Sequence, residues 1–241
     1  MISDAHIHFS DFAARFLAAH AVPTIVSCAT PEECARVSAF AADHPHVFVS
    51  CGIHPWRVDR TDPAAMQSWL DKAALIGEIG LDSVWCKTDL ALQRQRFEAQ
   101  LAYASAARKP VVLHLKGMEA AALELIRQYP NTYHVHWFSA MDHLDDYLAL
   151  GCYMSVGPFP SIDPAVAAVA ERTPLDRLLI ETDGLDAVRW ALGRDVAEAD
   201  YPAVLRQIAR EIAGIRGLTE ADVLEVTRAN LLCFAGAEKN A

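Results

Sequence analysis

The stretch Pro110–Leu115, PVVLHL, is apolar at nearly every position, so that both of its alternating faces are apolar. Residues 46–53 (HVFVSCGI) and 177–182 (RLLIET) share this pattern. A strand with two apolar faces is typical of a parallel sheet that is covered on both sides, because an antiparallel strand usually keeps one polar face for solvent. The three segments therefore predict buried parallel strands.

Eight such strand candidates are spaced along the chain, and amphipathic stretches separate them. The candidates are residues 1–6, 23–28, 46–52, 75–79, 111–115, 132–136, 152–156 and 178–182. Thr30, Asp62 and Asp163 each stand directly before a proline, which is a common signal for the start of a helix. A long amphipathic helix is expected over 89–108. The alternation predicts an α/β fold made of βα repeats.

Alternation alone fits both a closed barrel and an open, doubly wound sheet. No GxGxxG sequence follows the first strand candidate, which counts against a dinucleotide-binding sheet. The 241 residues suit one (β/α)8 TIM barrel, a fold of about 250 residues. The interior of the chain contains no linker and no low-complexity segment. We therefore expect residues 1–241 to form a single TIM-barrel domain.

Composition limits the class of protein. The formal net charge is −10, whereas a protein that binds long nucleic acid over its whole surface usually has a basic face. A small anionic substrate held by a metal ion remains compatible with this charge. The six cysteines form no CxxC pair, and the N-terminus is unlike a signal peptide. No segment has the roughly 18 consecutive apolar residues of a membrane span. These observations predict a cytoplasmic protein outside the membrane. Nothing in the chain indicates a protein partner.

His6 and His8 form an HxH pair at the end of the first strand candidate. Residues two apart in a strand point to the same side, so the two imidazoles can converge on one metal ion. Asp4 has the same alternation phase, and we expect it to support these ligands from a deeper position.

Four other strand candidates end in a residue that can bind metal: Glu78, His114, His136 and Asp183. Barrel enzymes gather catalytic residues at the carboxyl ends of their strands, and an unpaired charge after an apolar run would be costly. One such histidine alone is more often structural, and His134 competes with His136 on the same face. The whole set predicts a metal site for Zn²⁺, Mn²⁺ or Fe²⁺, with Mg²⁺ at a carboxylate-rich position.

Substrate contacts are less sharply defined. His54 is either a substrate contact or a loop histidine held by Pro55, and Asp82 either orients a ligand, binds a substrate hydroxyl or caps its loop. Lys116 belongs to a group of cations in the expected top loops that would suit a phosphate-bearing substrate. That group also includes Arg57, Lys87 and Arg189, and acidic residues in the same loops offset it. Trp56, Trp85 and Trp137 either stack on a base or wall a pocket.

At these residues the chain resembles the TatD family of metal-dependent hydrolases, which includes TatD-type deoxyribonucleases. The matching motifs are DAHIHF (4–9), GIHPW (52–56), GEIGLD (77–82), the helix start at 93–97, PVVLH (110–114), HWFSA (136–140), PLDRLLIETD (174–183) and TRANLLCF (227–234). They span nearly the whole chain. The pairing of GEIGLD with LLIETD at this separation is far more specific than any single HxH.

The resemblance implies a TIM barrel of the amidohydrolase-like type with two divalent metal ions, Zn²⁺, Mg²⁺ or Mn²⁺, and hydrolysis of DNA phosphodiester bonds. In the implied site, His6, His8 and Asp183 hold one ion, His114 and His136 hold the other, and Glu78 bridges them. The chain departs from the family at Lys116, where an arginine is usual, and in the residues after Asp183. DNA ends are a candidate substrate.

The expected mechanism is attack by a metal-activated water, with Glu78 and Asp183 as catalytic residues. A second interpretation keeps the site but assigns a lactone, ester or amide substrate. Close amidohydrolases often have a modified lysine where this chain has Glu78, which weighs against that interpretation. A third is a barrel that binds metal without catalysis, although retention of all six ligand positions argues against it.

Overall fold

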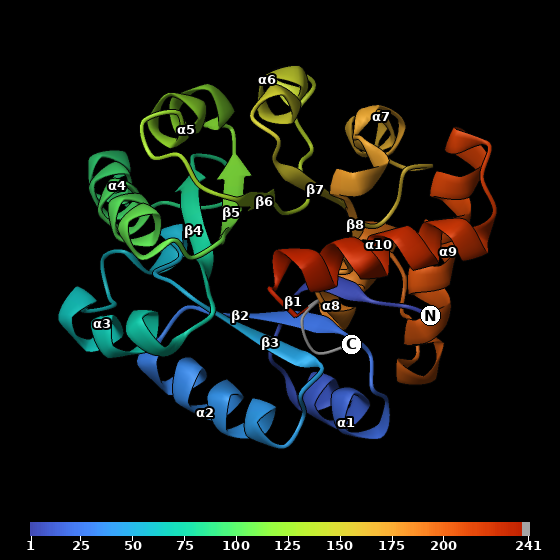
Figure 1. Cartoon of the computed structure of the whole chain (residues 1–241), viewed down its shortest axis with the longest axis horizontal. Helices are drawn as coiled ribbons and strands as arrows, with labels where there is room; N and C mark the ends of the chain where they lie inside the picture. Colours follow the sequence, from blue (N-terminus) through green and yellow to red (C-terminus); the bar gives the residue numbers. More distant parts are fainter. Residues whose placement is uncertain (238–241) are drawn as a thin grey trace.

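The computed structural model describes residues 1–237 and contains one sheet of eight parallel strands in the order β1 to β8 (Figure 1). The strands are β1 (Asp4–His8), β2 (Thr24–Cys28), β3 (Val47–Cys51), β4 (Leu75–Asp82), β5 (Val111–Lys116), β6 (Tyr133–Val135), β7 (Tyr153–Val156) and β8 (Leu178–Ile180). The backbone N–H of Asp183 donates to the carbonyl of His6 over 3.0 Å, which joins the end of β8 to β1. The predicted TIM barrel is confirmed.

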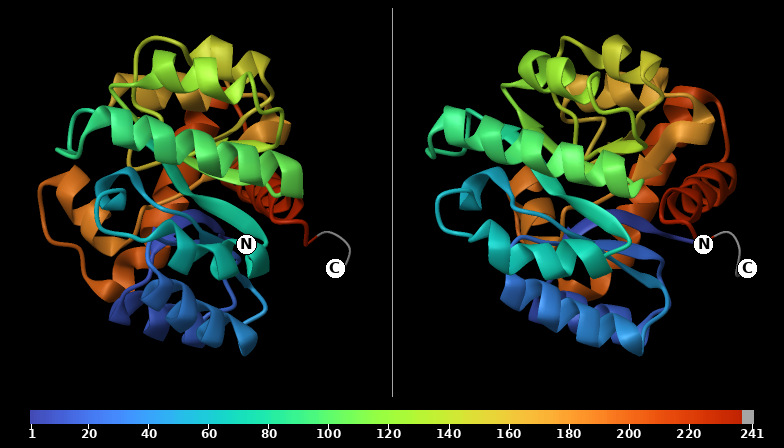
Figure 2. Two further views of the ribbon diagram at one scale, coloured as in Figure 1. Left: turned by 90° about the vertical axis from the view of Figure 1, so that its left-hand side faces the viewer. Right: turned by 60° about the vertical axis from the view of Figure 1, so that its left-hand side comes forward.

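A helix follows every strand and covers the outside of the barrel (Figures 1 and 2). The helices are α1 (Asp11–Ala19), α2 (Pro31–Ala42), α3 (Pro63–Lys72), α4 (Leu90–Ala107), α5 (Glu119–Ile126), α6 (Leu144–Ala149), α7 (Pro164–Arg172), α8 (Leu185–Leu192), α9 (Tyr201–Arg216) and α10 (Glu220–Phe234). Thr30, Asp62 and Asp163 accept hydrogen bonds from the first turns of α2, α3 and α7, as the proline signals predict.

The strand bounds predicted from the sequence, 1–6 for β1 and 75–79 for β4, are wrong, at both ends for β1 and at the carboxyl end for β4. β1 starts at Asp4 and continues to His8, and β4 continues to Asp82, so Glu78 lies inside β4 and not at its end. The extension depends on Gly80, because a Cβ there would lie 1.8 Å from the carbonyl oxygen of His114 on β5. Only glycine lets the two backbones approach this closely.

Helix α10 closes the amino-terminal end of the barrel. Its Leu231 and Phe234 pack in one buried cluster with residues near the start of six strands: Ala5, Ile25, Leu75, Val112, Tyr153 and Leu179. Within the described part of the chain, the cluster forms an apolar floor that fills the amino-terminal end of the barrel. Among residues 1–237, none of the helices combines the length and the apolarity needed to cross a membrane.

Replacing Phe234 with alanine removes the largest side chain that α10 contributes to this floor, which is 2% exposed. We expect Phe234→Ala to lower the free energy of unfolding by about 3–5 kcal/mol. Urea denaturation monitored by circular dichroism measures this change, with the exposed Glu225→Ala on the same helix as the control. A loss below 1 kcal/mol would show that the floor contributes little to stability.

Candidate metal centre

The carboxylate of Glu78 is the centre of the polar cluster inside the barrel. Its Oε1 lies 2.7 Å from Nδ1 of His114, 2.8 Å from Nε2 of His136 and 3.4 Å from Nε2 of His54. Its Oε2 lies 3.4 Å from Nε2 of both His6 and His8. The two oxygens therefore face two different sets of imidazoles, one from β5 and from just beyond the ends of β3 and β6, and one from β1.

Asp183 completes the second set. Its Oδ1 lies 3.4 Å from Nε2 of His6 and 3.6 Å from Nε2 of His8. The residue follows the last position of β8 by three residues and has a φ of 58°. This left-handed conformation is uncommon for a side chain other than glycine, and it occurs here where the loop turns the carboxylate back toward the imidazoles.

These side chains fit divalent cations. Three of the four groups of possible metal ligands found among residues 1–237 lie here, each with ligand atoms within 4.8 Å of one another: His6, His8 and Asp183; His6, Glu78 and His136; and His54, Glu78 and His114. Among residues 1–237, Nε2 of His6, Oε2 of Glu78 and Oδ1 of Asp183 are buried and have no hydrogen-bond partner. Buried polar atoms normally have one. A mixture of imidazole nitrogens and carboxylate oxygens is a typical ligand set for Zn²⁺ or Mn²⁺.

The carboxylate of Glu78 and the imidazoles around it shift each other's pKa. Burial raises the pKa of Glu78, but the surrounding histidines, with His136 and His54 foremost, hold it well below its usual value. Burial lowers the pKa of His114, but the charge of Glu78 and the hydrogen bond with Asp82 raise it to about 9. The cluster therefore needs positive charge around Glu78, which either protons or metal ions can supply.

Burial lowers the pKa of His54 to about 4. Its Nδ1 accepts a hydrogen bond of 3.1 Å from the backbone N–H of Trp56. The neutral ring then carries its proton on Nε2, which faces Oε1 of Glu78. The structure thus places His54 within the polar cluster, rather than as a loop histidine held only by Pro55.

Asp82 holds His114 and the adjoining loop in place. Its Oδ2 accepts hydrogen bonds from Nε2 of His114 at 3.0 Å and from Nε1 of Trp56 at 2.6 Å. Its Oδ1 accepts two backbone N–H groups, from Val84 and Trp85, at 2.8 Å each. Burial raises the pKa of Asp82, but the bonds from His114 and Trp56 outweigh it and keep the group ionised. Asp82 therefore caps its loop and fixes the orientation of the ligand candidate His114.

Glu181 was not among the residues expected from the sequence. It is fully buried, and its Oε1 lies 3.5 Å from Nδ1 of His136. The alternation of β8 could have indicated it, because Glu181 precedes Asp183 by two residues. The competing candidate His134 lies outside the three groups of possible ligands and makes a 2.8 Å hydrogen bond with Ser155.

The expected alternation phase of Asp4 is wrong. A register shift between Asp4 and Ile7 interrupts the alternation of β1, so Asp4 does not share the phase of the histidine pair. Its carboxylate accepts hydrogen bonds from the hydroxyls of Thr182 and Tyr201, and burial raises its pKa to about 7. Asp4 therefore fastens β1 to α9 and to the segment that leads into Asp183.

Lys116 ends β5, and its ammonium donates to the hydroxyl of Ser139 in the loop after β6. Burial lowers the pKa of this partly buried lysine. Arg189 is occupied near its own helix, with carboxylate oxygens of Asp186 and Asp195 at 3.0 and 2.9 Å. Of the expected cationic rim, Lys116 is therefore tied to a neighbouring loop and Arg189 to acidic side chains.

Replacing Asp82 with asparagine keeps the shape of the side chain but leaves one acceptor oxygen. It therefore cannot accept both from His114 and Trp56 on one side and from the two backbone N–H groups on the other. We expect Asp82→Asn to weaken metal affinity about 10- to 100-fold, because a supporting carboxylate fixes the orientation of the imidazole. Competition with a fluorescent chelator measures the affinity, and Asp59→Asn on the surface is the control. Unchanged affinity would mean that His114 does not bind metal through this arrangement.

Comparison with known proteins agrees with this geometry. Residues 3–234 match the family model described as TatD related DNase. The 3'-5' ssDNA/RNA exonuclease TatD of Dickeya dadantii is 30% identical over 204 residues, which cover 77% of this chain and 76% of that protein. The uncharacterized metal-dependent hydrolase YcfH of Escherichia coli K12 is 27% identical over 199 residues, covering 78% of this chain and 73% of that protein.

Solved structures share the fold. The crystal structure of YjjV, a TatD homologue from Escherichia coli K12, superposes with a TM-score of 0.82 at 23% identity and covers 97% of both chains. A hydrolase of the TatD family from Entamoeba histolytica gives 0.74 at 16% identity, covering 97% of this chain and 98% of that one. Because the family model matches nearly the whole of this chain, the chain belongs to the TatD-related DNase family of metal-dependent hydrolases.

Proposed function

We propose that the chain is a divalent-metal-dependent phosphodiesterase that hydrolyses nucleic acid, with the ends of DNA or RNA strands as its substrate. The observation that carries the proposal is the position of Glu78, whose two oxygens face two separate sets of imidazoles inside the barrel. A carboxylate between two ligand sets is the arrangement that a two-metal phosphodiesterase needs. The exonuclease activity named for the Dickeya relative supports the choice of substrate.

We assign one cation to His6, His8 and Asp183, and a second to His114 and His136, with Glu78 shared between them. The approach of His54 to Oε1 of Glu78 makes it an additional ligand candidate for the second cation. The predominance of nitrogen ligands favours Zn²⁺ or Mn²⁺ over Mg²⁺. Divalent cations held there supply a Lewis acid for phosphoryl oxygens and lower the pKa of a water molecule so that it can attack phosphorus near neutral pH.

Proton transfer and contact with the phosphate are assigned to different side chains of the site. Asp183 is 21% exposed whereas Glu78 is 2% exposed, so Asp183 is the carboxylate that can receive a proton from the attacking water. When the uncharged His54 binds no cation, it keeps its proton on Nε2 and can donate it to a phosphate oxygen. Lys116 offers one positive charge at the end of β5, although it lacks the two-pronged grip of an arginine on phosphate.

The alternatives have weaker support. A lactone, ester or amide substrate and a barrel without catalysis both fit the ligand set, but the named relatives include exonucleases and a 3'-5' RNA nuclease from Homo sapiens.

All six cysteines lie in residues 1–237 and are free there, which supports a reducing compartment such as the cytoplasm.

Glu78→Gln tests the metal-dependent activity directly. We expect turnover of single-stranded DNA to fall at least about a hundredfold, because the shared ligand loses its charge. Protein stripped with chelator is assayed with Mg²⁺, Mn²⁺ and Zn²⁺ added back, and circular dichroism verifies the fold. The surface variant Glu225→Ala, purified in parallel, excludes a contaminating nuclease. Undiminished cleavage by Glu78→Gln would remove the residue from the mechanism.

Asp183→Asn separates proton transfer from substrate binding. We expect kcat to fall by about 10²- to 10⁴-fold, the usual contribution of a general base, while KM changes little. Steady-state kinetics give both constants, and mass spectrometry of the bound metal gives the number of ions. A variant with wild-type kcat and one ion fewer would show that Asp183 only binds metal and that its ion is dispensable.

A further inference from the structure

Three tryptophans meet at the open end of the barrel. Trp85 lies in the loop between β4 and α4, Trp137 directly follows the ligand candidate His136, and Trp190 lies on α8. The ring centroids of Trp85 and Trp190 are 5.8 Å apart with an interplanar angle of 89°, and those of Trp137 and Trp190 are 6.1 Å apart at 71°. We refer to these three residues as the tryptophan cluster.

The cluster is unusually open to solvent. Trp190 is 66% exposed and Trp85 is 55% exposed, although tryptophan is on average one of the most buried residue types. Apolar rings that gather on the surface of a protein commonly mark a binding site, because their exposure to water is unfavourable unless a ligand covers them. Two mutually contacting indoles beside a reaction centre therefore point to a ligand with a flat, apolar face.

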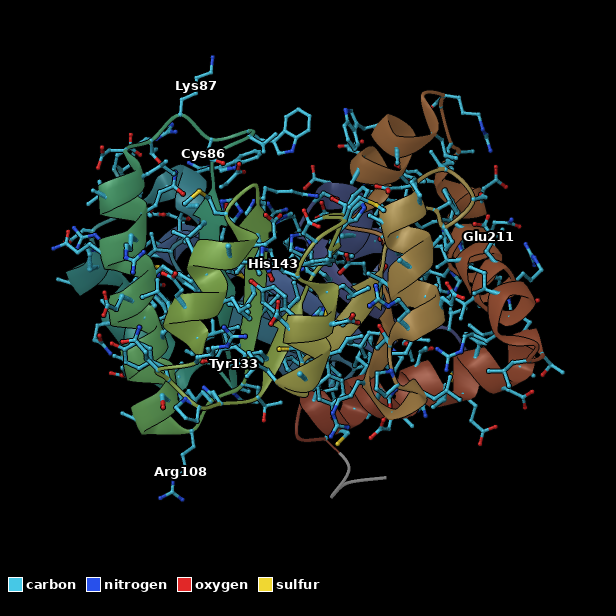
Figure 3. All side chains as sticks on the ribbon, turned by 90° about the horizontal axis from the view of Figure 1, so that it is seen from above. Cys86, Lys87, Arg108, Tyr133, His143 and Glu211 are labelled. Carbon is cyan, nitrogen blue, oxygen red and sulfur yellow. The ribbon has the colours of Figure 1, made fainter. Side chains whose placement is uncertain are left out.

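The cluster is connected to the metal centre through the backbone. The N–H of Trp85 donates to Asp82, which in turn bonds His114. Trp190 is carried by α8, which begins two residues after Asp183. Because β4 and β8 stand four strands apart in a ring of eight, the contact between Trp85 and Trp190 reaches across the open end. Figure 3 shows Cys86 and Lys87, the residues after Trp85, at the edge farthest from α10.

The rings are held so that flat surfaces remain available. An edge-to-face contact uses the edge of one indole, so both faces of that ring stay free of its partner. Trp137 is partly buried and rests on Gly157, where a Cβ would come within 2.9 Å of its ring. Trp137 is thereby fixed from below, while Trp85 and Trp190 extend into solvent.

We propose that Trp85, Trp137 and Trp190 form a stacking platform for unpaired nucleobases next to the phosphodiester that is hydrolysed. The proposal rests on the nuclease function above and adds the means by which a strand end is held. Stacking accepts every base, since each has a π-face, and it requires a base that is not already stacked in a duplex. The platform therefore selects single-stranded ends without selecting sequence.

The charge distribution points the same way. The net charge is −10, Arg189 is paired with Asp186 and Asp195, and Lys116 contacts Ser139. Binding through phosphate charges would make affinity fall steeply with salt, in proportion to the number of phosphates neutralised. Arg57 and Lys87 remain exposed in the top loops, but the overall charge is negative, so stacking supplies much of the affinity and the dependence on salt is shallow.

The test compares two strands of equal length and charge: oligothymidylate and an oligomer of abasic deoxyribose phosphates. Fluorescence anisotropy measures binding in chelator, so that neither strand is cleaved. We expect Trp85→Ala and Trp190→Ala each to weaken oligothymidylate binding roughly tenfold and to leave abasic binding unchanged. Trp190→Phe, which keeps an aromatic face, retains most of the affinity. Trp69→Ala on α3, a tryptophan outside the cluster, is the matched control and binds as the wild type does.

Equal binding of both oligomers by the wild-type protein, or no effect of either alanine variant, would overturn the platform. So would self-association that Trp190→Ala abolishes while oligothymidylate binding is unchanged, because the cluster would then be a contact between copies of the chain. Failure of the nuclease function has a different signature. Base-dependent binding that the tryptophan variants weaken, without any cleavage that depends on Glu78, would refute the nuclease and retain the platform.

Discussion

The burial of one carboxylate among five imidazoles is the constraint on which the site depends. Glu78 is almost inaccessible to solvent, and a charge in such a place is costly unless groups of opposite charge surround it. The barrel supplies those groups from β1, from β5, and from residues just beyond the ends of β3 and β6. Each of these strands must therefore end at the right height and in the right register, and the helices outside hold that register.

The alternation of apolar strands and amphipathic helices predicted parallel strands in βα repeats, because strands buried on both faces have a distinctive pattern. The chain length, the missing GxGxxG sequence and the resemblance to the TatD family favoured the closed barrel over an open sheet. The polar residues near strand ends likewise indicated the ligand candidates. What the pattern could not reveal was irregular backbone. The register shift within β1 turns Asp4 away from the histidine pair, and one between Ile76 and Ile79 brings Glu78 into the interior although Leu75 also faces inward. A strict period of two cannot represent either shift.

Contacts between distant loops were equally beyond the reach of the sequence. Trp85 and Trp137 were recognisable as residues of the top loops, but Trp190 is on a helix more than 50 residues away from either of them and contacts both. The sequence left His54 open between a substrate contact and a loop histidine, and only the fold places it against Glu78. Residues of this kind depend on the closure of the ring, which no local pattern encodes.

The apolar floor built on α10 has a consequence for the movement of a polymer. Because Leu231 and Phe234 fill the amino-terminal end, the barrel is a cup and not a tunnel, and a strand cannot be threaded through it. A strand end that enters past the tryptophan cluster must leave by the same opening. A released nucleotide and the shortened strand therefore share one exit, so each round of cleavage requires the product to clear the opening before the new end can advance.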